Sequence, residues 1–299
     1  GLSSMPDSAK LLGSDAALTW LRGKGGLDLQ FATPAAPPHG NSAGPAIVQA
    51  PSSTIALTFH EEPVVYRPPT ISASSAIFID AITPEFSKAP KDCEVRYTID
   101  GSDPTSESPV ATSVAGLHES TTVMAALFHG KDQVSDVVSK HFEKVAPWPA
   151  HDAAPYKQGL TVQEFHGDWD VVPDWDSLTP TRTFAESRVF MDGDVAKPEE
   201  YVGRRYTATL MVPATAVYRF ALTSDDGSVF KIDGKIVVDN DKLHGPETKL
   251  GDVALMGGPH RVEVGWFNKT GGLALDLKWA RLSENGFGTL AQIPESALK

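Results

Sequence analysis

The sequence contains a single cysteine, Cys93, among its 299 residues. One thiol cannot form an internal disulfide or a cysteine metal cluster, so we interpret Cys93 as a small, half-buried apolar residue. The sequence also lacks an apolar run long enough to cross a bilayer, which predicts no membrane span. No stretch sustains the apolar period of an amphipathic helix over three turns, so the sequence predicts an all-β fold.

Basic residues are scarce relative to acidic ones. The chain has 26 Lys and Arg against 38 Asp and Glu, which gives a formal net charge of −12. Surfaces that bind phosphate need clustered Lys and Arg, so we expect no nucleic-acid partner. Residues 1–7 lack the basic region and apolar core of a signal peptide. Both a mature chain and a fragment whose leader lies far upstream remain open.

Residues 222–235 contain two turn signals between alternating apolar residues. The first is Asp-Asp-Gly-Ser at residues 225–228, and the second is Asp-Gly at residues 233–234. Asp-Gly favours hairpin turns because glycine adopts a positive φ freely, so the pattern predicts a hairpin at each turn. Asp225 and Asp226 also place two hard oxygen donors in one loop, which is how a calcium site begins.

The region from about residue 156 to 299 resembles the protective-antigen-type (PA-14) β-sandwich of adhesins and of appendages on glycoside hydrolases. The resemblance rests on spaced segments that agree in order: 159–175, 222–235, G-x-V-x-L at 251–255, G-x-H-x-V-x-V at 258–264, and 267–279. It implies a PA-14-type β-sandwich domain over residues 152–299.

The same resemblance implies a ligand set. In calcium-dependent lectins of this family, two successive Asp residues joined by a cis peptide bind Ca²⁺, which also coordinates sugar hydroxyls. Asp225 and Asp226 match these positions, and Asn268 maps onto the next ligand. In many enzyme-attached members the same turn serves only as a turn, whose carboxylates accept backbone N–H bonds. Both readings remain open.

Aromatic residues suggest further contacts with carbohydrate, because an indole face stacks on the C–H face of a pyranose. Trp169 and Trp175 lie among several aspartates, so we expect them to be exposed. Trp266 and Trp279 follow alternating patterns and are expected in the core. The expected glycan-binding residues are therefore Asp225, Asp226, His244, Trp169 and Trp175. His244 and His260 lack a second histidine at metal-binding spacing, which favours turn or core roles.

The middle of the chain carries a second resemblance. The run Tyr-Thr-Ile-Asp-Gly-Ser-Asp-Pro-Thr at residues 97–105 resembles the signature of the small fibronectin-III-like domain appended to chitobiases and hexosaminidases. The resemblance implies a small sandwich over residues 68–145. Asp100 and the other polar residues of the run are turn formers, so we expect this domain to bind no ligand of its own.

The first part of the chain carries a third resemblance. Residues 11–31, with Leu-Leu-Gly-x-Asp followed by Gly-Leu-x-Leu, resemble the last strands of the C-terminal sandwich of α-L-fucosidases of glycoside hydrolase family 29. The resemblance implies a partial β-sandwich remnant plus linker over residues 1–59. Residues 34–53 are rich in Pro, Gly, Ser and Ala, and we expect little regular structure there beyond a lone strand at 46–48.

These features predict a non-catalytic accessory region that binds glycan for a secreted, periplasmic or cell-surface glycoside hydrolase, α-L-fucosidase-like. Glycosidic hydrolysis needs a facing pair of carboxylates on a scaffold such as a (β/α)₈ barrel, for which this chain has neither the alternation nor the room. The catalytic domain would then lie upstream. One alternative is a structural spacer or protein-docking module. Another is one part of an α-L-fucosidase whose barrel is on a separate segment.

Overall fold

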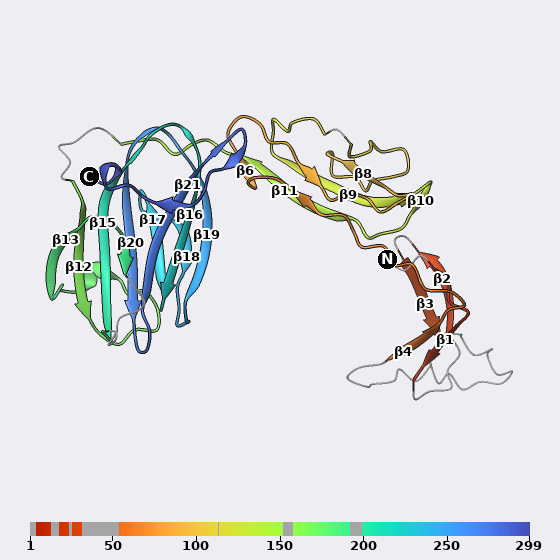
Figure 1. Cartoon of the computed structure of the whole chain (residues 1–299), viewed down its shortest axis with the longest axis horizontal. Helices are drawn as coiled ribbons and strands as arrows, with labels where there is room; N and C mark the ends of the chain where they lie inside the picture. Colours follow the sequence, from red (N-terminus) through yellow and green to blue (C-terminus); the bar gives the residue numbers. More distant parts are fainter. Residues whose placement is uncertain are drawn as a thin grey trace, which may run out of the picture. The chain divides into compact units, whose positions relative to one another are not determined.

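A computed structural model describes residues 4–12, 18–23, 26–31, 54–112, 114–151, 158–191 and 199–299. The chain divides into two compact units, Gly1–Ala73 with Ile82–Phe142, and Ser74–Ala81 with Glu143–Lys299. The expected loop at 34–53, with its lone strand, lies outside the described residues. Strands dominate both units (Figure 1), which confirms the all-β prediction. None of the helices in the described ranges has the length and hydropathy needed to span a bilayer.

The first unit opens with short antiparallel ladders. β1 pairs with β4, β2 with β3, and β5 with β7. Their bounds are β1 (Ser8–Leu11), β2 (Leu18–Gly23), β3 (Gly26–Phe31), β4 (Ile55–Thr58), β5 (Ile71–Ser72) and β7 (Glu85–Phe86). The strands expected between residues 9 and 31 are therefore present. An isolated two-stranded ladder is marginally stable at best, because it buries little apolar surface.

The main sheet of the first unit is built around β9, which pairs with β8, β10 and β11. These strands are β8 (Glu94–Thr98), β9 (Thr121–His129), β10 (Asp132–Gln133) and β11 (Val138–Lys144). Val95, Ala125 and Leu127 form its small core, and half-buried Cys93 packs against it, as predicted. Asp100 Oδ1 accepts the backbone N–H of Ser102 at 3.0 Å, which confirms its role as a turn former.

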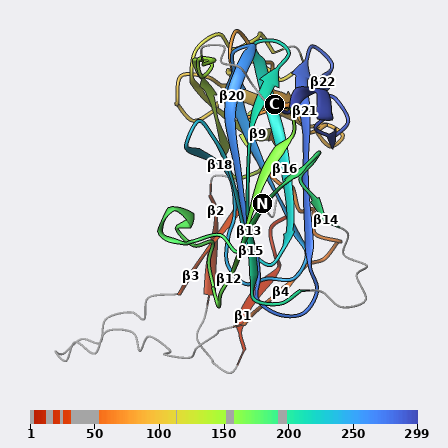
Figure 2. The ribbon, with the colours of Figure 1, turned by 90° about the vertical axis from the view of Figure 1, so that its left-hand side faces the viewer.

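The second unit consists of two six-stranded sheets packed face to face. The first sheet has the order β13-β12-β15-β20-β17-β18, and Figure 2 shows its strands running lengthwise. Its strands are β12 (Leu160–His166), β13 (Arg182–Glu186), β15 (Val202–Val212), β17 (Ser228–Ile232), β18 (Lys235–Asn240) and β20 (Gly258–Asn268). In this sheet every ladder is antiparallel.

The second sheet has the order β14-β21-β16-β19, and two short strands, β22 and β23, also pair with β21. Its strands are β14 (Phe190–Met191), β16 (Ala216–Asp225), β19 (Glu247–Leu255), β21 (Ala274–Ser283), β22 (Gly286–Phe287) and β23 (Ala291–Gln292). Two 3₁₀ turns, η1 (Trp175–Ser177) and η2 (Glu295–Ala297), flank the sheets. β6 (Ile77–Phe78) also belongs to this unit and pairs in parallel with Glu143 and Lys144 of β11.

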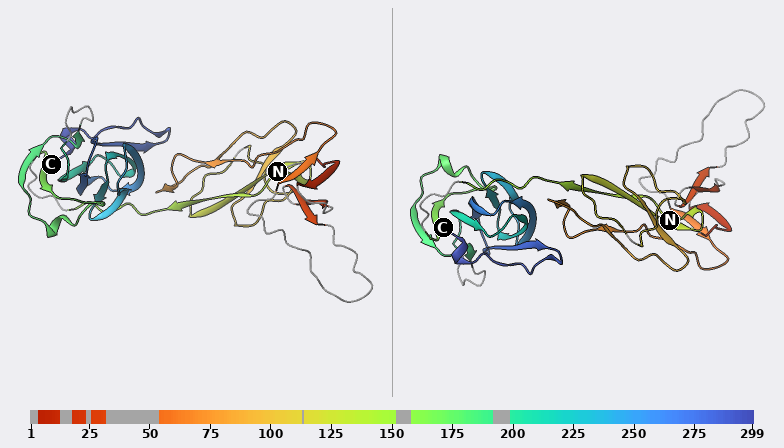
Figure 3. Two further views of the ribbon diagram at one scale, coloured as in Figure 1. Left: turned by 90° about the horizontal axis from the view of Figure 1, so that it is seen from below. Right: turned by 90° about the horizontal axis from the view of Figure 1, so that it is seen from above.

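The core lies between the two sheets, which Figure 3 shows nearly end on. Phe220 of the second sheet meets Phe230 of the first, with ring centroids 4.8 Å apart. Trp266 is 1% exposed, and half-buried Trp279 stacks on Tyr218 at 5.4 Å. The sequence-based expectation that both tryptophans serve the core is therefore confirmed. His260 is also fully buried, as expected for a core histidine.

The first predicted hairpin is wrong. The turn at residues 225–228 does not join paired strands, because β16 belongs to the second sheet and β17 to the first. β16 pairs with β19 and β21, whereas β17 pairs with β18 and β20. The turn therefore carries the chain from one sheet to the other across one end of the sandwich. A turn signal specifies local backbone geometry, and the burial of each strand selects its partners.

The second predicted hairpin is confirmed, since Asp233 and Gly234 join β17 to β18 with φ angles of 52° and 77°. Positive φ at both central residues is what a type I′ turn requires. Burial raises the pKa of the Asp233 carboxyl, but hydrogen bonds from His260, the Arg261 N–H and His151 outweigh it and hold the pKa below its usual range. These bonds measure 2.7–2.8 Å.

Gly251 lies at one side of the sandwich, where β18 of the first sheet approaches β19 of the second. A Cβ on Gly251 would overlap the carbonyl oxygen of Val237. We expect Gly251→Ala to destabilise the chain by about 1–3 kcal/mol, since a backbone atom must move to make room. Gly288→Ala is the matched control, because nothing lies within 4 Å of its Cβ position. Urea denaturation of both variants measures the difference, and equal stabilities would contradict this account of the contact.

Candidate functional site

Asp225 and Asp226 lie where the chain crosses between the sheets. β16 ends at Asp225, and β17 begins at Ser228. The peptide bond between the two aspartates is cis, as the resemblance implied. Asp225 is 8% exposed and Asp226 is 7% exposed. Two adjacent carboxylates are therefore largely removed from water, so each needs hydrogen-bond donors or a cation near it.

Asp226 ties three loops together. Its Oδ1 accepts the backbone N–H of His244 at 3.3 Å, and its Oδ2 accepts the backbone N–H of Lys269 at 2.9 Å. The loop that follows β18 and the loop that follows β20 are thus both fixed to the turn at residues 225–228. Beside it, the Gly227 carbonyl accepts the N–H of Phe267 at 3.0 Å. These three loops make the candidate site at one end of the sandwich.

The Asp225 carboxylate accepts no hydrogen bond from the described part of the chain. Burial raises its pKa, the neighbouring Asp226 charge raises it further, and His244 partly opposes both effects. The loop after β20 passes close to it, because a Cβ on Gly272 would lie 3.0 Å from Asp225 Oδ2. A carboxylate in a largely buried residue that is close to a glycine and accepts no hydrogen bond is suited to binding a cation.

Asn268 is the third predicted metal ligand. Its residue is fully buried, and its Nδ2 donates to the backbone carbonyl of Glu199 at 2.7 Å. That bond orients the amide and leaves Asn268 Oδ1 as a buried acceptor with no partner among the described residues. Buried polar atoms are rarely left unpaired, so an unpaired acceptor calls for a ligand. Asn268 neighbours Lys269, whose N–H binds Asp226, so the structure brings all three predicted metal ligands to the same loop junction.

His244 lies at this junction but offers no free ring nitrogen. Its Nδ1 lies 2.7 Å from the Gly245 carbonyl and its Nε2 lies 2.9 Å from the Asn240 carbonyl. Burial lowers the pKa of its imidazole, but these carbonyl acceptors and the charges of Glu247 and Asp226 outweigh it, and the pKa is raised. His244 therefore closes its loop and binds Asp226 through its backbone rather than its ring.

The expectation of an exposed Trp175 is wrong. Trp175 is 5% exposed and packs against Phe165, with ring centroids 4.9 Å apart. Its indole covers glycines on the outer face of the first sheet, since Cβ atoms on Gly203 and Gly265 would lie 2.7 and 2.6 Å from it. Trp169 is half-buried and meets Trp175 edge to face at 6.0 Å. A glycan contact from Trp169 stays a prediction.

Three further residues near the loop junction were not predicted from the sequence: Lys269, Leu243 and Tyr201. The ammonium of Lys269 lies 2.8 Å from Asp168 and 2.8 Å from Asp170, and these carboxylates raise its pKa. Tyr201 is 42% exposed, and its N–H donates to the Lys269 carbonyl at 2.9 Å. Leu243, next to His244, is 47% exposed. The sequence could have indicated Leu243, because it is an apolar residue within a polar turn.

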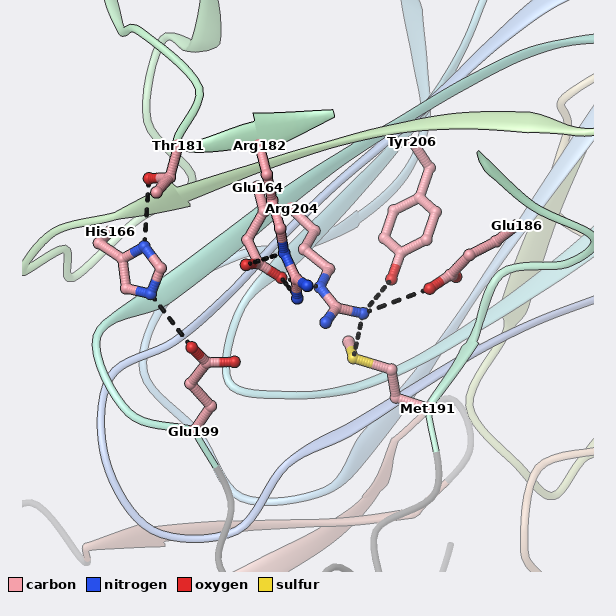
Figure 4. Close-up of polar contacts among 9 residues, drawn as sticks. All are labelled: Glu164, His166, Thr181, Arg182, Glu186, Met191, Glu199, Arg204 and Tyr206. Carbon is pink, nitrogen blue, oxygen red and sulfur yellow. Dashed lines mark hydrogen bonds and ion pairs between the residues drawn. The ribbon is translucent and has the colours of Figure 1, made fainter. Parts of the chain in front are cut away.

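A second group of potential ligands, Glu164, His166 and Glu199, lies on the first sheet and its flank. Figure 4 shows that the carboxylate of Glu164 is already occupied: Arg182 binds it at 2.6 Å and Arg204 at 2.9 Å. Glu164 is 2% exposed, and two guanidinium groups beside it would repel a cation. We therefore interpret this group as an ion network that holds β12, β13 and β15 together.

Comparisons with protein families identify the domains. Residues 159–289 match the family model described as PA14 domain, and residues 85–142 match the one described as Fn3 associated. The chain therefore contains a PA14 domain and an Fn3-associated domain, as two of the resemblances implied. No curated protein matches the chain.

Similar solved structures include the following three. The PA14 sugar-binding domain from an RTX adhesin is 17% identical, with a TM-score of 0.41, and covers 48% of this chain and 98% of its own. The PA14 domain of the MpAFP antifreeze protein is 18% identical, with a TM-score of 0.40 and coverages of 50% and 94%. The epithelial adhesin 9 A domain from Candida glabrata, in complex with Galb1-4GlcNAc, is 10% identical, with a TM-score of 0.40 and coverages of 50% and 93%.

Proposed function

We propose that the PA14 domain binds carbohydrate through Ca²⁺ held by Asp225, Asp226 and Asn268. The observation that carries the proposal is the Asp225 carboxylate, which accepts no hydrogen bond in the described chain and belongs to a residue that is 8% exposed, near Asn268 Oδ1, a buried acceptor without a partner among the described residues. Calcium prefers carboxylate and amide oxygens, so the donor set fits. When bound, the ion would supply open coordination positions for sugar hydroxyls. The resemblance to calcium-dependent lectins also supports this role.

The chain's own residues would position the ion and the sugar. The two backbone N–H bonds to Asp226 fix the loops around the ion. Lys269, held between Asp168 and Asp170, fixes a further loop to the same end. Leu243, beside His244, and Tyr201, which directly precedes β15 and donates its N–H to the Lys269 carbonyl, are exposed and can cover the C–H face of a pyranose.

One observation favours a second function, that of a structural spacer or docking module. Asp226 accepts two backbone N–H bonds, as a turn-capping carboxylate would. In that role the turn would hold the two sheets together without an ion. Asp225 argues against it, because a capping role leaves this carboxylate buried without a donor in the described chain.

We also propose that the chain serves a secreted or cell-surface glycoside hydrolase as an accessory region. Its support is the resemblance of residues 11–31 to the terminal strands of α-L-fucosidases, where β2 and β3 form the expected strands. Glycan binding by the PA14 domain would then keep the catalytic domain, on another segment, near its substrate. Turnover of an aryl α-L-fucoside by the chain with and without an upstream segment tests this role.

Retention on a glycan array tests carbohydrate binding. The labelled chain is applied in millimolar calcium and again with a chelator. We expect retention in calcium alone, and we expect Asp226→Ala to lose it while Asp80→Ala, an exposed aspartate outside the site, keeps it. Retention that survives the chelator would contradict the calcium role, and no retention under either condition would favour the structural spacer.

A further inference from the structure

The chain crosses from the second sheet to the first at a turn that no strand pairing holds in place. β16 ends at Asp225 and β17 begins at Ser228, and these two strands do not pair with each other. In a hairpin, backbone hydrogen bonds between the paired strands fix the turn that joins them. The turn at residues 225–228 lacks that support, so its geometry depends on other contacts.

Buried hydroxyl groups join the two ends of this turn. Ser224 directly precedes Asp225, and Ser228 directly follows Gly227. Ser228 Oγ donates to Ser224 Oγ at 2.7 Å, and both residues are fully buried. The low local dielectric of the interior strengthens such a bond. This bond therefore fixes the separation of β16 and β17 at the point where the chain crosses between the sheets.

Asn240, at the end of β18, extends the network to a further strand. Its Nδ2 donates to Ser224 Oγ at 2.9 Å and to the backbone carbonyl of Glu247 at 3.1 Å. A carbonyl oxygen can only accept, so the bond to Glu247 fixes which way the amide points. Asn240 Oδ1 is buried with no partner among the described residues. We call Ser224, Ser228 and Asn240 the polar clamp, because they link β16 and β19 of the second sheet to β17 and β18 of the first.

The polar clamp is connected to Asp226 through His244. His244 Nε2 lies 2.9 Å from the backbone carbonyl of Asn240, and the His244 N–H donates to Asp226 Oδ1 at 3.3 Å. Trp266 Nε1 also donates to the backbone carbonyl of Asp225 at 3.1 Å. The backbone of the aspartate pair is thus held in place, while the Asp225 carboxylate accepts no hydrogen bond from the described residues.

We propose that the polar clamp positions Asp225 and Asp226 for calcium, an inference that rests on the proposed function. Ligands that are already held in place lose less conformational freedom when the ion binds, so the ion binds more tightly. The clamp consists of uncharged hydroxyl and amide groups, so it fixes the turn without neutralising the carboxylates. Its three members are positioning residues, which act on the ion only through the two aspartates.

Isothermal titration of the whole chain with calcium chloride tests the proposal. Ser224→Ala/Ser228→Ala removes both partners of the central hydrogen bond and leaves Asn240 bonded to Glu247. We expect this variant to bind calcium about tenfold more weakly or worse, because groups that orient metal ligands contribute about that much to affinity. Removing both partners of a hydrogen bond costs little stability. Urea denaturation in chelator should therefore find the variant nearly as stable as the unmodified chain.

Thr223→Val is the matched control. It removes a hydroxyl of β16 whose oxygen lies 2.7 Å from Thr248 Oγ1, next to Ser224 but on the other face of the strand. We expect it to bind calcium like the unmodified chain. Ser228→Ala alone is a milder variant, since the Asn240 bond to Ser224 remains, and it should weaken calcium binding by a smaller factor. It replaces the double variant if that one does not fold.

The outcomes separate the polar clamp from the calcium site. Weaker calcium binding with unchanged stability in chelator supports positioning by the clamp. Calcium binding that the serine variants retain in full overturns the clamp alone, as does an equal loss of affinity in Thr223→Val. A loss of stability without a loss of affinity also overturns it, because the serines would then serve the fold only. No calcium binding by the unmodified chain overturns the calcium site and the clamp together.

Discussion

Calcium is expected to raise the melting temperature of the chain, and Asp226→Ala is expected to abolish the rise. An ion that binds the folded state alone stabilises it by RT ln(1 + [L]/Kd), about 2.7 kcal/mol at a hundredfold excess over Kd. The physical source here is the buried Asp225 carboxylate, which has no donor in the described chain and faces the charge of Asp226. A thermal melt in chelator and in millimolar calcium measures the rise.

A matched variant separates an ion site from a turn cap. Asp226→Asn keeps an acceptor oxygen for a backbone N–H of His244 or Lys269 but removes the charge. We expect it to fold in chelator, with one of the two backbone bonds to residue 226 lost, and to gain little from calcium. Asp80→Ala, outside the junction, should gain as much as the unmodified chain. Equal melting temperatures in chelator and in calcium would refute the ion site and leave Asp226 as a turn cap.

Glu164→Gln is expected to lower the free energy of unfolding by about 3–5 kcal/mol, the cost of breaking a buried ion pair by removing one partner. Glu164 is 2% exposed, and its carboxylate binds Arg182 and Arg204 together (Figure 4). The Arg204 side chain is 15% exposed, so the neutral amide leaves a largely buried guanidinium without its main counterion. Urea denaturation at neutral pH measures the loss, with Glu284→Gln, an exposed residue, as the control.

The same variant predicts a pH dependence. Burial raises the pKa of Glu164, but the hydrogen bond from Arg182 and the charge of Arg204 outweigh it and hold the pKa below its usual range. A depressed pKa adds stability above the unfolded-state value, about 4.3, and that stability is lost as pH falls through the lower folded value. The gap between the unmodified chain and Glu164→Gln should therefore shrink in acid. A gap that stays constant with pH would show that Glu164 acts through packing rather than charge.

The sequence could identify those residues of the candidate site whose chemistry depends on neighbouring residues alone. Adjacent aspartates in a Gly-Ser turn identify Asp225 and Asp226 as paired oxygen donors whatever the fold around them. Asn268 could be named by its motif, but its role as a buried acceptor depends on the Glu199 carbonyl, which lies 69 residues away in the chain. Lys269 and Tyr201 could not be found, since their place follows from loops that meet only after both sheets have formed.

The tryptophans show the same difference between what the local sequence specifies and what depends on residues far apart in the chain. Trp266 alternates with core residues along a strand, and such alternation specifies burial directly. Trp175 follows a run of aspartates and reads as exposed, yet it fills a hollow above Gly203 and Gly265. Those glycines lie on neighbouring strands, β15 and β20, that come together only in the sheet. A hollow made by distant residues leaves no local signal at the residue that fills it.

The sequence by itself determined the class of fold, the turns and the residues able to bind an ion, because strand alternation, turn chemistry and oxygen donors are properties of neighbouring residues. Only the tertiary structure decided that the turn at residues 225–228 crosses between sheets. It also decided that Asp225, a largely buried residue, lies near Asn268 Oδ1, which is buried without a donor among the described residues. Pairing partners, desolvation and charge density depend on residues far apart in the chain, which meet only when the two sheets pack.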